Sequence, residues 1–215
     1  TAKVVLSGTR LGRLLNPHKL MERLAVEILH GQPASIDVVV SEQAGKKALI
    51  AGAGIDAEIV RRKSELKGKS SLFGQYSSLR SYVQGGLTAF YDLPSIEALV
   101  NVDGERYRVS DFISTIVMKS KYSGYGFKAC PEAELTGGNL FVRSVAGPKW
   151  RTGVKVMFSS TFGGNSQGRS DKGKKVNIQT SHPVPMQIGG DYVSEGQEFE
   201  FRVEENALNV IIPQT

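Results

Sequence analysis

The chain has 215 residues and a mass of 23.3 kDa, and 40% of its residues are hydrophobic and 22% charged. This composition lies near the globular average and excludes a disordered or collagen-like chain, and no apolar run approaches the roughly 20 residues that a membrane-spanning helix needs. With 27 Lys and Arg against 21 Asp and Glu, the formal charge is +6 and the pI is about 9.4, which favours an anionic partner: nucleic acid, acidic lipid headgroups or a phosphorylated substrate.

The cysteine and histidine residues limit the chemistry open to the chain. A single cysteine, Cys130, excludes an internal disulfide framework and suits a reducing compartment, so we expect a cytoplasmic protein. His18, His30 and His182 are scattered, and none has a metal-ligand spacing with Cys or Glu, so no metal site is predicted. The start at Thr1 has neither a signal-peptide layout nor an initiator Met, and we expect further residues upstream.

Residues 1–33 form the first predicted segment. Residues 3–7, Lys-Val-Val-Leu-Ser, favour a short buried strand, which Gly8-Thr9 ends. Asn16-Pro17 then predicts the start of a helix, because Asn is a good N-cap and Pro fits the first helical turn. Gly31 is expected to end this helix as a C-cap.

Residues 34–215 are predicted to be mostly β-strand. Residues 36–40 and 47–51 indicate a hairpin around Gly45, and one helix is predicted at residues 71–89.

The remaining strands are short and are separated by turns that contain Gly and Asp. The polar stretch 163–175 is predicted to be a mobile loop. Many short strands with few helices predict a mostly β (α+β) fold, an antiparallel β-sandwich or barrel with a few helices. The further strands are predicted at residues 95–102, 105–109, 112–118, 140–144, 153–159, 176–180, 185–188, 198–203 and 207–212.

The segment from Gly52 to Glu58, Gly-Ala-Gly-Ile-Asp-Ala-Glu, is the first candidate for chemistry. Glycines after a strand allow the close approach of a ligand or of another backbone segment, and Asp56 and Glu58 would then accept hydrogen bonds from substrate hydroxyls. The alternative is a tight strand end with two solvated carboxylates, and the spacing leaves both interpretations open. Without a Gly-x-Gly-x-x-Gly pattern, the segment does not predict a dinucleotide site.

Two basic segments are candidates for an anionic partner. Gly124 and Gly126 lie among aromatic residues in the segment 119–131, which either lines a phosphate-binding cleft or connects two strands with a solvated basic rim. The run Arg61-Arg62-Lys63 is either a membrane contact, where each charge contributes about 1 kcal/mol towards binding anionic lipid, or a solvated loop. Nucleic acid is not predicted as a partner, because the basic residues are not interleaved with aromatic residues as in RNA-binding proteins.

Asp191 follows a Gly-Gly turn, Gly189-Gly190, late in the chain. A carboxylate on such a turn is well placed to meet a cation or a hydroxyl, although Asp is also common in ordinary hairpin turns. No Ser-His-Asp or Cys-His spacing indicates nucleophilic catalysis.

Taken in order, these segments resemble the C-terminal domain of the diacylglycerol kinase-type lipid kinases, a superfamily that also holds sphingosine kinases and, more distantly, NAD kinases. The resemblance covers nearly the whole chain, and its most specific part is the Gly…Phe…Pro-x-Ala segment that ends at Ala133. The matching segments are Ser7-Gly8-Thr9 for Pro-x-Gly-Thr, Gly54-Ile-Asp-Ala-Glu58 for Gly-Phe-Asp-Ala-Glu, Tyr122-Ser-Gly-Tyr-Gly-Phe127 with Pro131-Glu-Ala133 for Gly-Gly-Gly-Phe…Pro-x-Ala, Leu135-Thr-Gly-Gly-Asn-Leu140 for Leu-Asp-Asp-Gly-x-Leu, and Gln187-Ile-Gly-Gly-Asp191 for an Asp-Gly-Glu turn.

This resemblance implies an ATP-dependent lipid kinase, in which a lipid hydroxyl attacks the γ-phosphoryl group while magnesium neutralises the phosphates. It implies that residues 1–33 end a nucleotide-binding domain or form a hinge, and that residues 34–215 form the β-sandwich domain. The protein would act as a peripheral protein at an anionic membrane, with a lipid substrate, and the resemblance also allows a homodimer. The implied roles are nucleotide binding for Gly8 and Thr9, substrate binding for Asp56, Glu58, Gly124 and Gly126, catalysis for Asp191, and membrane contact for Arg61, Arg62 and Lys63.

Several acidic positions of the family pattern are altered in this chain. The Asn-Asp pair after Gly-Thr is replaced by Leu11-Gly12, and the metal-associated Asp-Asp is replaced by Thr136-Gly137. The Gly-Gly-Asp-Gly-Thr nucleotide loop is expected upstream of the chain. The alternative function is therefore a non-catalytic lipid- or partner-binding module on the same fold, and a nucleotide substrate, as in NAD kinases, is a third option.

Overall fold

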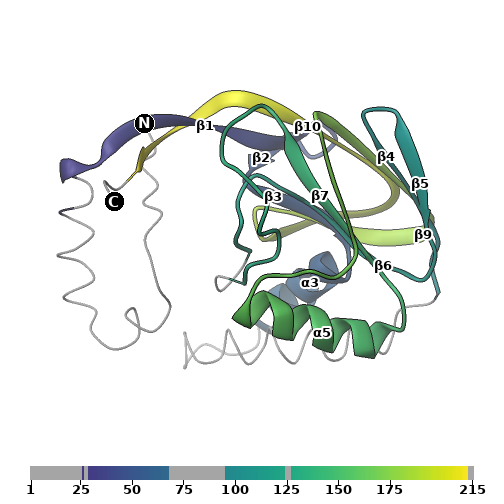
Figure 1. Cartoon of the computed structure of the whole chain (residues 1–215). Coiled ribbons are helices and arrows are strands. Elements are labelled where there is room, and N and C mark those ends of the chain that lie inside the picture. The colour runs from purple at the N-terminus through teal and green to yellow at the C-terminus, as the bar shows by residue number, and fades with distance from the viewer. Residues whose placement is uncertain (1–25, 27–28, 68–94, 124–126, 213–215) are drawn as a thin grey trace.

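The computed structural model describes residues 26, 29–67, 95–123 and 127–212, which form an antiparallel β-sheet structure with two helices (Figure 1). The predicted strand at 3–7, the predicted helix at 71–89 and most of the one predicted to end at Gly31 lie outside the described residues. In chain order the elements are β1 (Gln32–Ser41), β2 (Lys46–Ala48), β3 (Ile50–Gly54), α3 (Ile55–Lys67), β4 (Ala98–Val102), β5 (Glu105–Val109), β6 (Phe112–Met118), β7 (Leu140–Ala146), α5 (Lys149–Phe162), β8 (Arg169–Gly173), β9 (Lys175–Ile188) and β10 (Asp191–Ile212).

The sheet folds over itself at β9. One hydrogen-bonded path runs through β2-β1-β10-β9-β3-β6-β7-β8. The first half of β9, residues 176–180, pairs with β4, whereas its second half, residues 186–188, pairs with β3. The β4–β5 hairpin therefore lies over β7 and β8 as a second layer, and the predicted β-sandwich is confirmed.

The main core fills the space between these layers. Alternate residues of each strand point inward because side chains of a strand alternate between its two faces, and β4 shows this alternation along its whole length. Val100, Val142, Ile178 and Phe201, from four different strands, are wholly buried in this core. Burial of each such side chain stabilises the fold by about 1.5–3 kcal/mol.

Helices α3 and α5 lie on the same side of the sheet (Figure 1). Ile55 and Ile59 of α3 form a small apolar cluster with Ile113 of β6 and Val145 of β7, and Val156 of α5 packs against it. Among the described helices, none is both long and apolar enough to cross a membrane.

The strand predicted at residues 153–159 is wrong, because these residues belong to helix α5. Gly153, Val156 and Ser160 turn towards the protein, whereas Val154 and Phe158 are exposed. The apolar residues at 154, 156 and 158 imitate the alternation of a strand, but burial follows the three- and four-residue spacing of a helix.

Three further expectations are corrected. The basic run at residues 61–63 is part of helix α3 and not a loop, and the stretch 163–175 contains strand β8, which pairs with β7. The last four predicted strands merge into the two long strands β9 and β10, which bend at irregular positions instead of ending there. The hairpin around Gly45 is confirmed by the pairing of β1 with β2.

Candidate functional site

A sharp reversal of the chain between β3 and α3 forms the base of the candidate site. Gly54 ends β3 with φ +107°, a conformation that favours glycine, and a Cβ atom there would overlap the backbone oxygen of Ile113. Helix α3 begins at the next residue and lies back along β9 and β10. The close backbone approach predicted for these glycines is confirmed.

The reversal places the carboxylate of Asp56 over Gly52. A Cβ atom at Gly52 would lie 2.5 Å from Oδ2 of Asp56, so the absence of a side chain there makes room for the carboxylate. Ser114 Oγ donates a hydrogen bond to Asp56 Oδ1 at 2.8 Å, and Gln187 Nε2 donates one to Oδ2 at 3.2 Å. Asp56 is half-buried, and this desolvation raises the pKa of its carboxyl above the usual value despite the two hydrogen bonds.

Gln187 connects Asp56 to the turn that carries Asp191. Its Oε1 atom accepts a hydrogen bond of 3.0 Å from the backbone N–H of Gly190, while its Nε2 atom donates to Asp56. Gly189 and Gly190 both have positive φ and form the two-residue turn between β9 and β10, and Asp191 follows it with an exposed side chain. Gln187, which the sequence did not single out, thus joins Asp56 to the turn that precedes Asp191, whereas Asp191 itself pairs with Ile188 in the ladder.

Glu58, the second acidic residue of the segment, is buried and bound to two arginines. Its carboxylate accepts hydrogen bonds from Arg61 Nε at 2.7 Å and from Arg62 Nε at 2.5 Å. Burial acts to raise the pKa of Glu58, but the hydrogen bonds from Arg61 and Arg62 outweigh it and hold the pKa below its usual value. The interpretation of solvated carboxylates is therefore wrong for Glu58, and two residues of the predicted membrane-contact run bind within their own helix.

A buried cation lies at the end of β6. Lys119 is wholly buried, so the solvated basic rim expected there is wrong for this lysine. Its Nζ atom donates to Asp37 Oδ2 at 3.0 Å and to the backbone oxygens of Thr136 and Asn139 at 3.3 and 2.7 Å. All three N–H groups of the ammonium therefore have acceptors.

Asp37, the partner of Lys119, accepts hydrogen bonds from three donors in total. It accepts hydrogen bonds from the backbone N–H groups of Gly138 and Asn206 at 2.8 and 3.0 Å. Burial acts to raise the pKa of Asp37, but these hydrogen bonds and Lys119 lower it overall. We call Lys119, Asp37 and the loop 135–139 the buried lysine cluster.

The buried lysine cluster includes the loop where the family resemblance expects two metal-associated carboxylates. Thr136 and Gly137 stand at those positions, and Lys119 Nζ binds the carbonyl oxygen of Thr136. The residues of this loop do not fit a divalent cation, because the lysine ammonium already supplies a positive charge to its oxygens. Within the described ranges, no three His, Cys, Asp or Glu side chains are grouped as a metal site.

The segment after Lys119 carries the glycines predicted to bind substrate. Gly124 and Gly126 lie outside the described residues, as do Gly8 and Thr9, and the side chain of Lys63 is not described. Burial raises the pKa of the Cys130 thiol to about 12, so this cysteine is protonated at pH 7 and unsuited to nucleophilic attack.

Sequence reasoning missed Gln187, Ser114 and the buried lysine cluster. A signal for the cluster was present: Asp37 interrupts an apolar strand, and Lys119 directly follows another. Opposite charges inside or next to apolar strands are rarely buried unless they pair. No comparable signal marked Gln187 or Ser114, because single polar residues in strands are common.

The pH dependence of stability provides a test of the Asp56 environment. The carboxyl of Asp56 has a raised pKa in the folded state, so folding is favoured when this carboxyl is protonated. Its contribution to the free energy of unfolding is complete below the unfolded-state pKa of about 3.9 and is lost as the pH rises through the folded-state pKa. We expect Asp56→Asn to increase the free energy of unfolding at pH 7 by about 0.5–2 kcal/mol, because an amide avoids burying a charge. Chemical denaturation at several pH values should show that this gain disappears below pH 4.

Asp191→Asn is the control, because it removes an exposed carboxylate, and it should change the free energy of unfolding by less than about 0.5 kcal/mol. An equal gain in both variants would refute the raised pKa of Asp56 as the cause.

Comparison with known proteins identifies the fold. A family model described as the YegS C-terminal NAD kinase beta sandwich-like domain matches residues 48–212. Crystal structures of a "putative diacylglycerol kinase from Bacillus anthracis str. Sterne" superpose with a TM-score of 0.62 at 13% identity, covering 87% of this chain and 60% of that one. A further crystal structure of a diacylglycerol kinase from the same organism gives a TM-score of 0.61 at 13% identity, covering 87% of this chain and 59% of that one. No curated protein matches the chain significantly. The chain therefore spans about 60% of the length of the similar structures.

Proposed function

The chain belongs to the family of the YegS C-terminal NAD kinase beta sandwich-like domain, and from this membership we propose that it is the C-terminal, substrate-binding part of an ATP-dependent lipid kinase. In the proposed reaction a lipid hydroxyl attacks the γ-phosphoryl group of ATP, which breaks the bond to ADP and releases the hydroxyl proton. Phosphoryl transfer of this kind depends mainly on positioning and on charge stabilisation.

The observation that carries this proposal is the hydrogen-bonded connection between Asp56, Gln187 and the Gly189-Gly190 turn. It joins two segments that are 131 residues apart, and both resemble motifs of the lipid kinases. The connection joins the half-buried carboxylate of Asp56 to the turn that precedes the exposed Asp191, so the two carboxylates lie in different environments. Groups whose environments differ in this way are suited to different roles in one reaction.

We assign Asp56 to orienting the lipid headgroup and Asp191 to accepting the hydroxyl proton. The hydrogen bonds from Ser114 and Gln187 hold the carboxylate of Asp56 in one orientation. Asp191 begins β10 directly after the turn, and its side chain is exposed to a substrate. ATP would supply the phosphoryl group, with magnesium on its phosphates, and Gly8 and Thr9 would contribute to its binding.

The test is transfer of radiolabelled phosphate from ATP to lipids by the full-length polypeptide. Diacylglycerols and long-chain bases in detergent micelles are the first substrates to examine. We expect Asp191→Asn to lower kcat on the order of 100-fold, the usual effect of removing a general base. Glu195→Gln removes an exposed carboxylate from the same strand and should leave kcat within about two-fold of the unmodified protein. Absence of transfer to every lipid, or an equal loss in both variants, would overturn the proposal.

A second candidate function is a non-catalytic lipid- or partner-binding module, and the buried lysine cluster favours it. Lys119 supplies a fixed positive charge at the loop where the family pattern has carboxylates, which is consistent with loss of a metal-dependent step. Lipid binding by the full-length polypeptide without ATP binding or phosphate transfer would support this candidate.

A further inference from the structure

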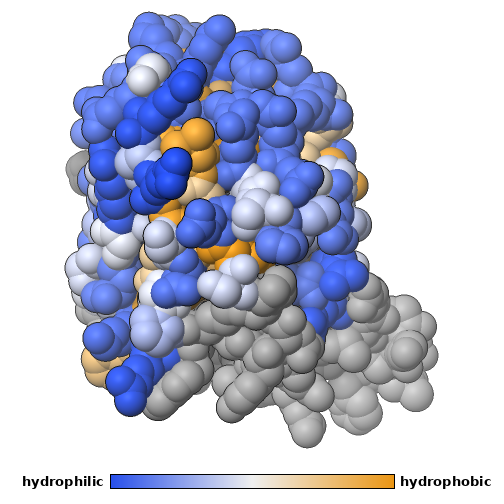
Figure 2. Space-filling view, turned by 90° about the vertical axis from the view of Figure 1, so that its right-hand side faces the viewer, coloured by the Kyte–Doolittle hydropathy of each residue, from blue (hydrophilic) through white to orange (hydrophobic). Residues whose placement is uncertain are grey.

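Lys119 is buried in a molecule whose charged residues mostly lie at the surface. Hydrophilic side chains cover most of the described part of the face that Figure 2 shows, which is the usual place for charged residues. The side chain of Lys119 is 0% exposed, and it is the single wholly buried lysine within the described ranges. Removing an ammonium group from water is costly unless other groups take the place of water. The groups around Lys119 therefore explain how its charge is tolerated.

Oxygen atoms from β1 and from the loop before β7 surround the ammonium of Lys119. Asp37 contributes Oδ2 at 3.0 Å, and Thr136 and Asn139 contribute their backbone oxygens at 3.3 and 2.7 Å. One carboxylate oxygen and two carbonyl oxygens are also a typical set of ligands for a hard metal cation. The Nζ atom thus occupies a position whose surroundings suit a cation.

The charges of the buried lysine cluster match a cation with a single positive charge. Asp37 is the only acidic residue of the cluster, because Thr136 and Gly137 stand where the family pattern has two aspartates. One ammonium neutralises one carboxylate, whereas a divalent cation would leave excess charge in a site removed from water. The presence of Lys119 and the loss of the two acidic residues therefore have one explanation, the exchange of a metal ion for an ammonium.

The loop 135–139 depends on this buried pair for its shape. The backbone N–H of Asp37 donates to the carbonyl oxygen of Leu135 at 2.8 Å, and the carboxylate of Asp37 accepts from the N–H of Gly138 at 2.8 Å. With the two carbonyl oxygens bound by Lys119, four of the five loop residues are hydrogen-bonded to the pair. A bound metal ion holds a loop in the same way, through its carbonyl oxygens.

We propose that Lys119 is a built-in cation that takes the place of a bound metal ion at the loop 135–139, so that the loop keeps its shape without a metal. The proposal concerns this loop alone and not the magnesium on the nucleotide phosphates. Truncating Lys119 should then leave Asp37 Oδ2 and the two carbonyl oxygens as a site for a free cation. Calcium is the suitable probe, because it takes roughly six to eight oxygen ligands in flexible geometry and water can supply the remainder.

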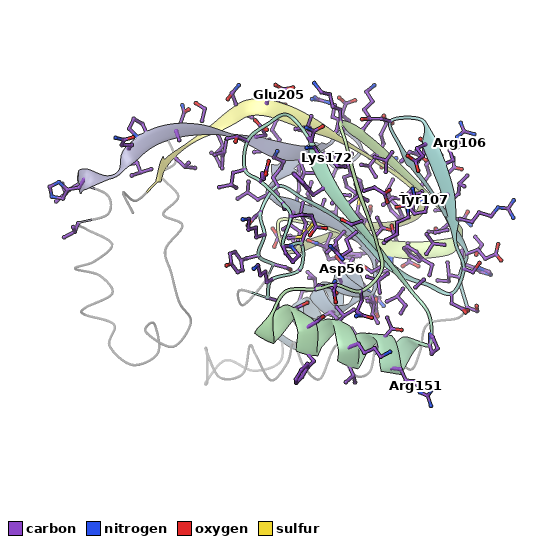
Figure 3. The ribbon with its side chains drawn as sticks, in the orientation of Figure 1. Asp56, Arg106, Tyr107, Arg151, Lys172 and Glu205 are labelled. Carbon is purple, nitrogen blue, oxygen red and sulfur yellow. The ribbon has the colours of Figure 1, made fainter. Side chains whose placement is uncertain are left out.

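The buried lysine cluster lies apart from the candidate site at Asp56. A Cβ atom on Gly138 would lie 2.7 Å from Oε1 of Glu205, so Glu205 marks the position of the loop. Figure 3 shows Glu205 at the upper edge of the molecule and Asp56 on the lower side, near α3. The inference goes beyond the proposed function, because it requires neither lipid nor ATP.

The experiment is thermal unfolding of the full-length Lys119→Ala variant, in EDTA and in calcium chloride at about 10 mM. We expect the substitution to lower Tm by about 10 °C in EDTA, because it leaves a buried carboxylate without its cation. Calcium should raise the Tm of the variant by about 3–6 °C, the shift for a site with a Kd of about 1 mM. The Tm of the unmodified protein should differ by less than about 1 °C between the two solutions, because Lys119 fills the site.

Two control variants separate the site from general effects of calcium. Lys119→Met fills the space with an uncharged side chain, so it should lose stability and gain none from calcium. Lys47→Ala frees the carboxylate of Glu204 at the surface and should also gain none. Equal stabilisation by calcium in the unmodified protein or in a control variant would place the bound ion elsewhere and overturn the proposal.

Propylammonium, which has the structure of the group removed in Lys119→Ala, distinguishes the two kinds of cation. Recovery of Tm with propylammonium but not with calcium would show that these oxygens accept only an ammonium, and the metal assignment would be wrong. No recovery with either cation would also contradict it.

A refolding measurement covers the case in which Lys119→Ala does not fold in EDTA. The variant is diluted from urea into calcium or into EDTA, and its circular dichroism spectrum is compared with that of the unmodified protein. Recovery of the native spectrum in calcium alone would support the proposal, because binding of the ion would then drive folding; no recovery in calcium would contradict it. Asp191→Asn should lose phosphate transfer yet resemble the unmodified protein in all these measurements, so failure of the proposed function gives a different result.

Discussion

Lys119→Met is expected to lower the free energy of unfolding by about 3–5 kcal/mol, the usual cost of removing one partner of a buried ion pair. The substitution fills a similar volume but leaves Asp37 without its cation and the carbonyl oxygens of Thr136 and Asn139 without a donor. Asp37 keeps two backbone hydrogen bonds, which do not compensate for a buried negative charge. Urea unfolding followed by circular dichroism measures the loss.

Lys47→Met is the matched control for this variant. Lys47 forms an ion pair of 2.5 Å with Glu204, but its side chain is 55% exposed. Exposed pairs contribute about 0–1 kcal/mol, so the control should remain close to the unmodified protein. If both variants lose a similar free energy of unfolding, the burial of Lys119 does not determine how much its ion pair contributes to stability.

The double variant Arg61→Met/Arg62→Met is the second change with a large expected effect. Glu58 has a side chain only 5% exposed, and the substitutions would remove both cations that bind it. We expect a loss of about 3 kcal/mol or more, because a buried carboxylate without a partner is strongly destabilising. Each single variant should lose much less, because one arginine remains.

The pH dependence of this second effect follows from the lowered pKa of Glu58. The arginine pairs stabilise the fold fully above the unfolded pKa of about 4.3, and this contribution is lost as the pH falls through the folded pKa. The difference in free energy of unfolding between the unmodified protein and the double variant should therefore become smaller below pH 4. Adding Glu58→Met to the double variant should restore part of the stability at pH 7, and no restoration would contradict the explanation.

These stability effects bear on how membrane binding is tested. Substituting Arg61 and Arg62 removes the two arginines that bind the carboxylate of Glu58. Weaker vesicle binding by such a variant can therefore reflect partial unfolding.

The sequence by itself determined the class of fold and the location of the candidate motifs. Short apolar strands and turns such as Gly189-Gly190 are local signals, because strand alternation and positive φ depend on neighbouring residues. The same local character explains the error at residues 153–159, where alternating apolar residues predicted a strand in the place of helix α5. Residue order was also sufficient for the family resemblance, since its motifs are contiguous segments.

Only the tertiary structure decided which polar groups meet. Lys119 binds Asp37 across 82 residues, and Gln187 binds Asp56 across 131 residues. Both contacts depend on which strands are neighbours in the sheet and on how far each side chain is removed from water, and neither property is encoded in local periodicity. The tertiary structure also separates the two carboxylates of one motif. Asp56 lies over Gly52 and binds Gln187, whereas Glu58, two residues later, is bound by arginines of its own helix.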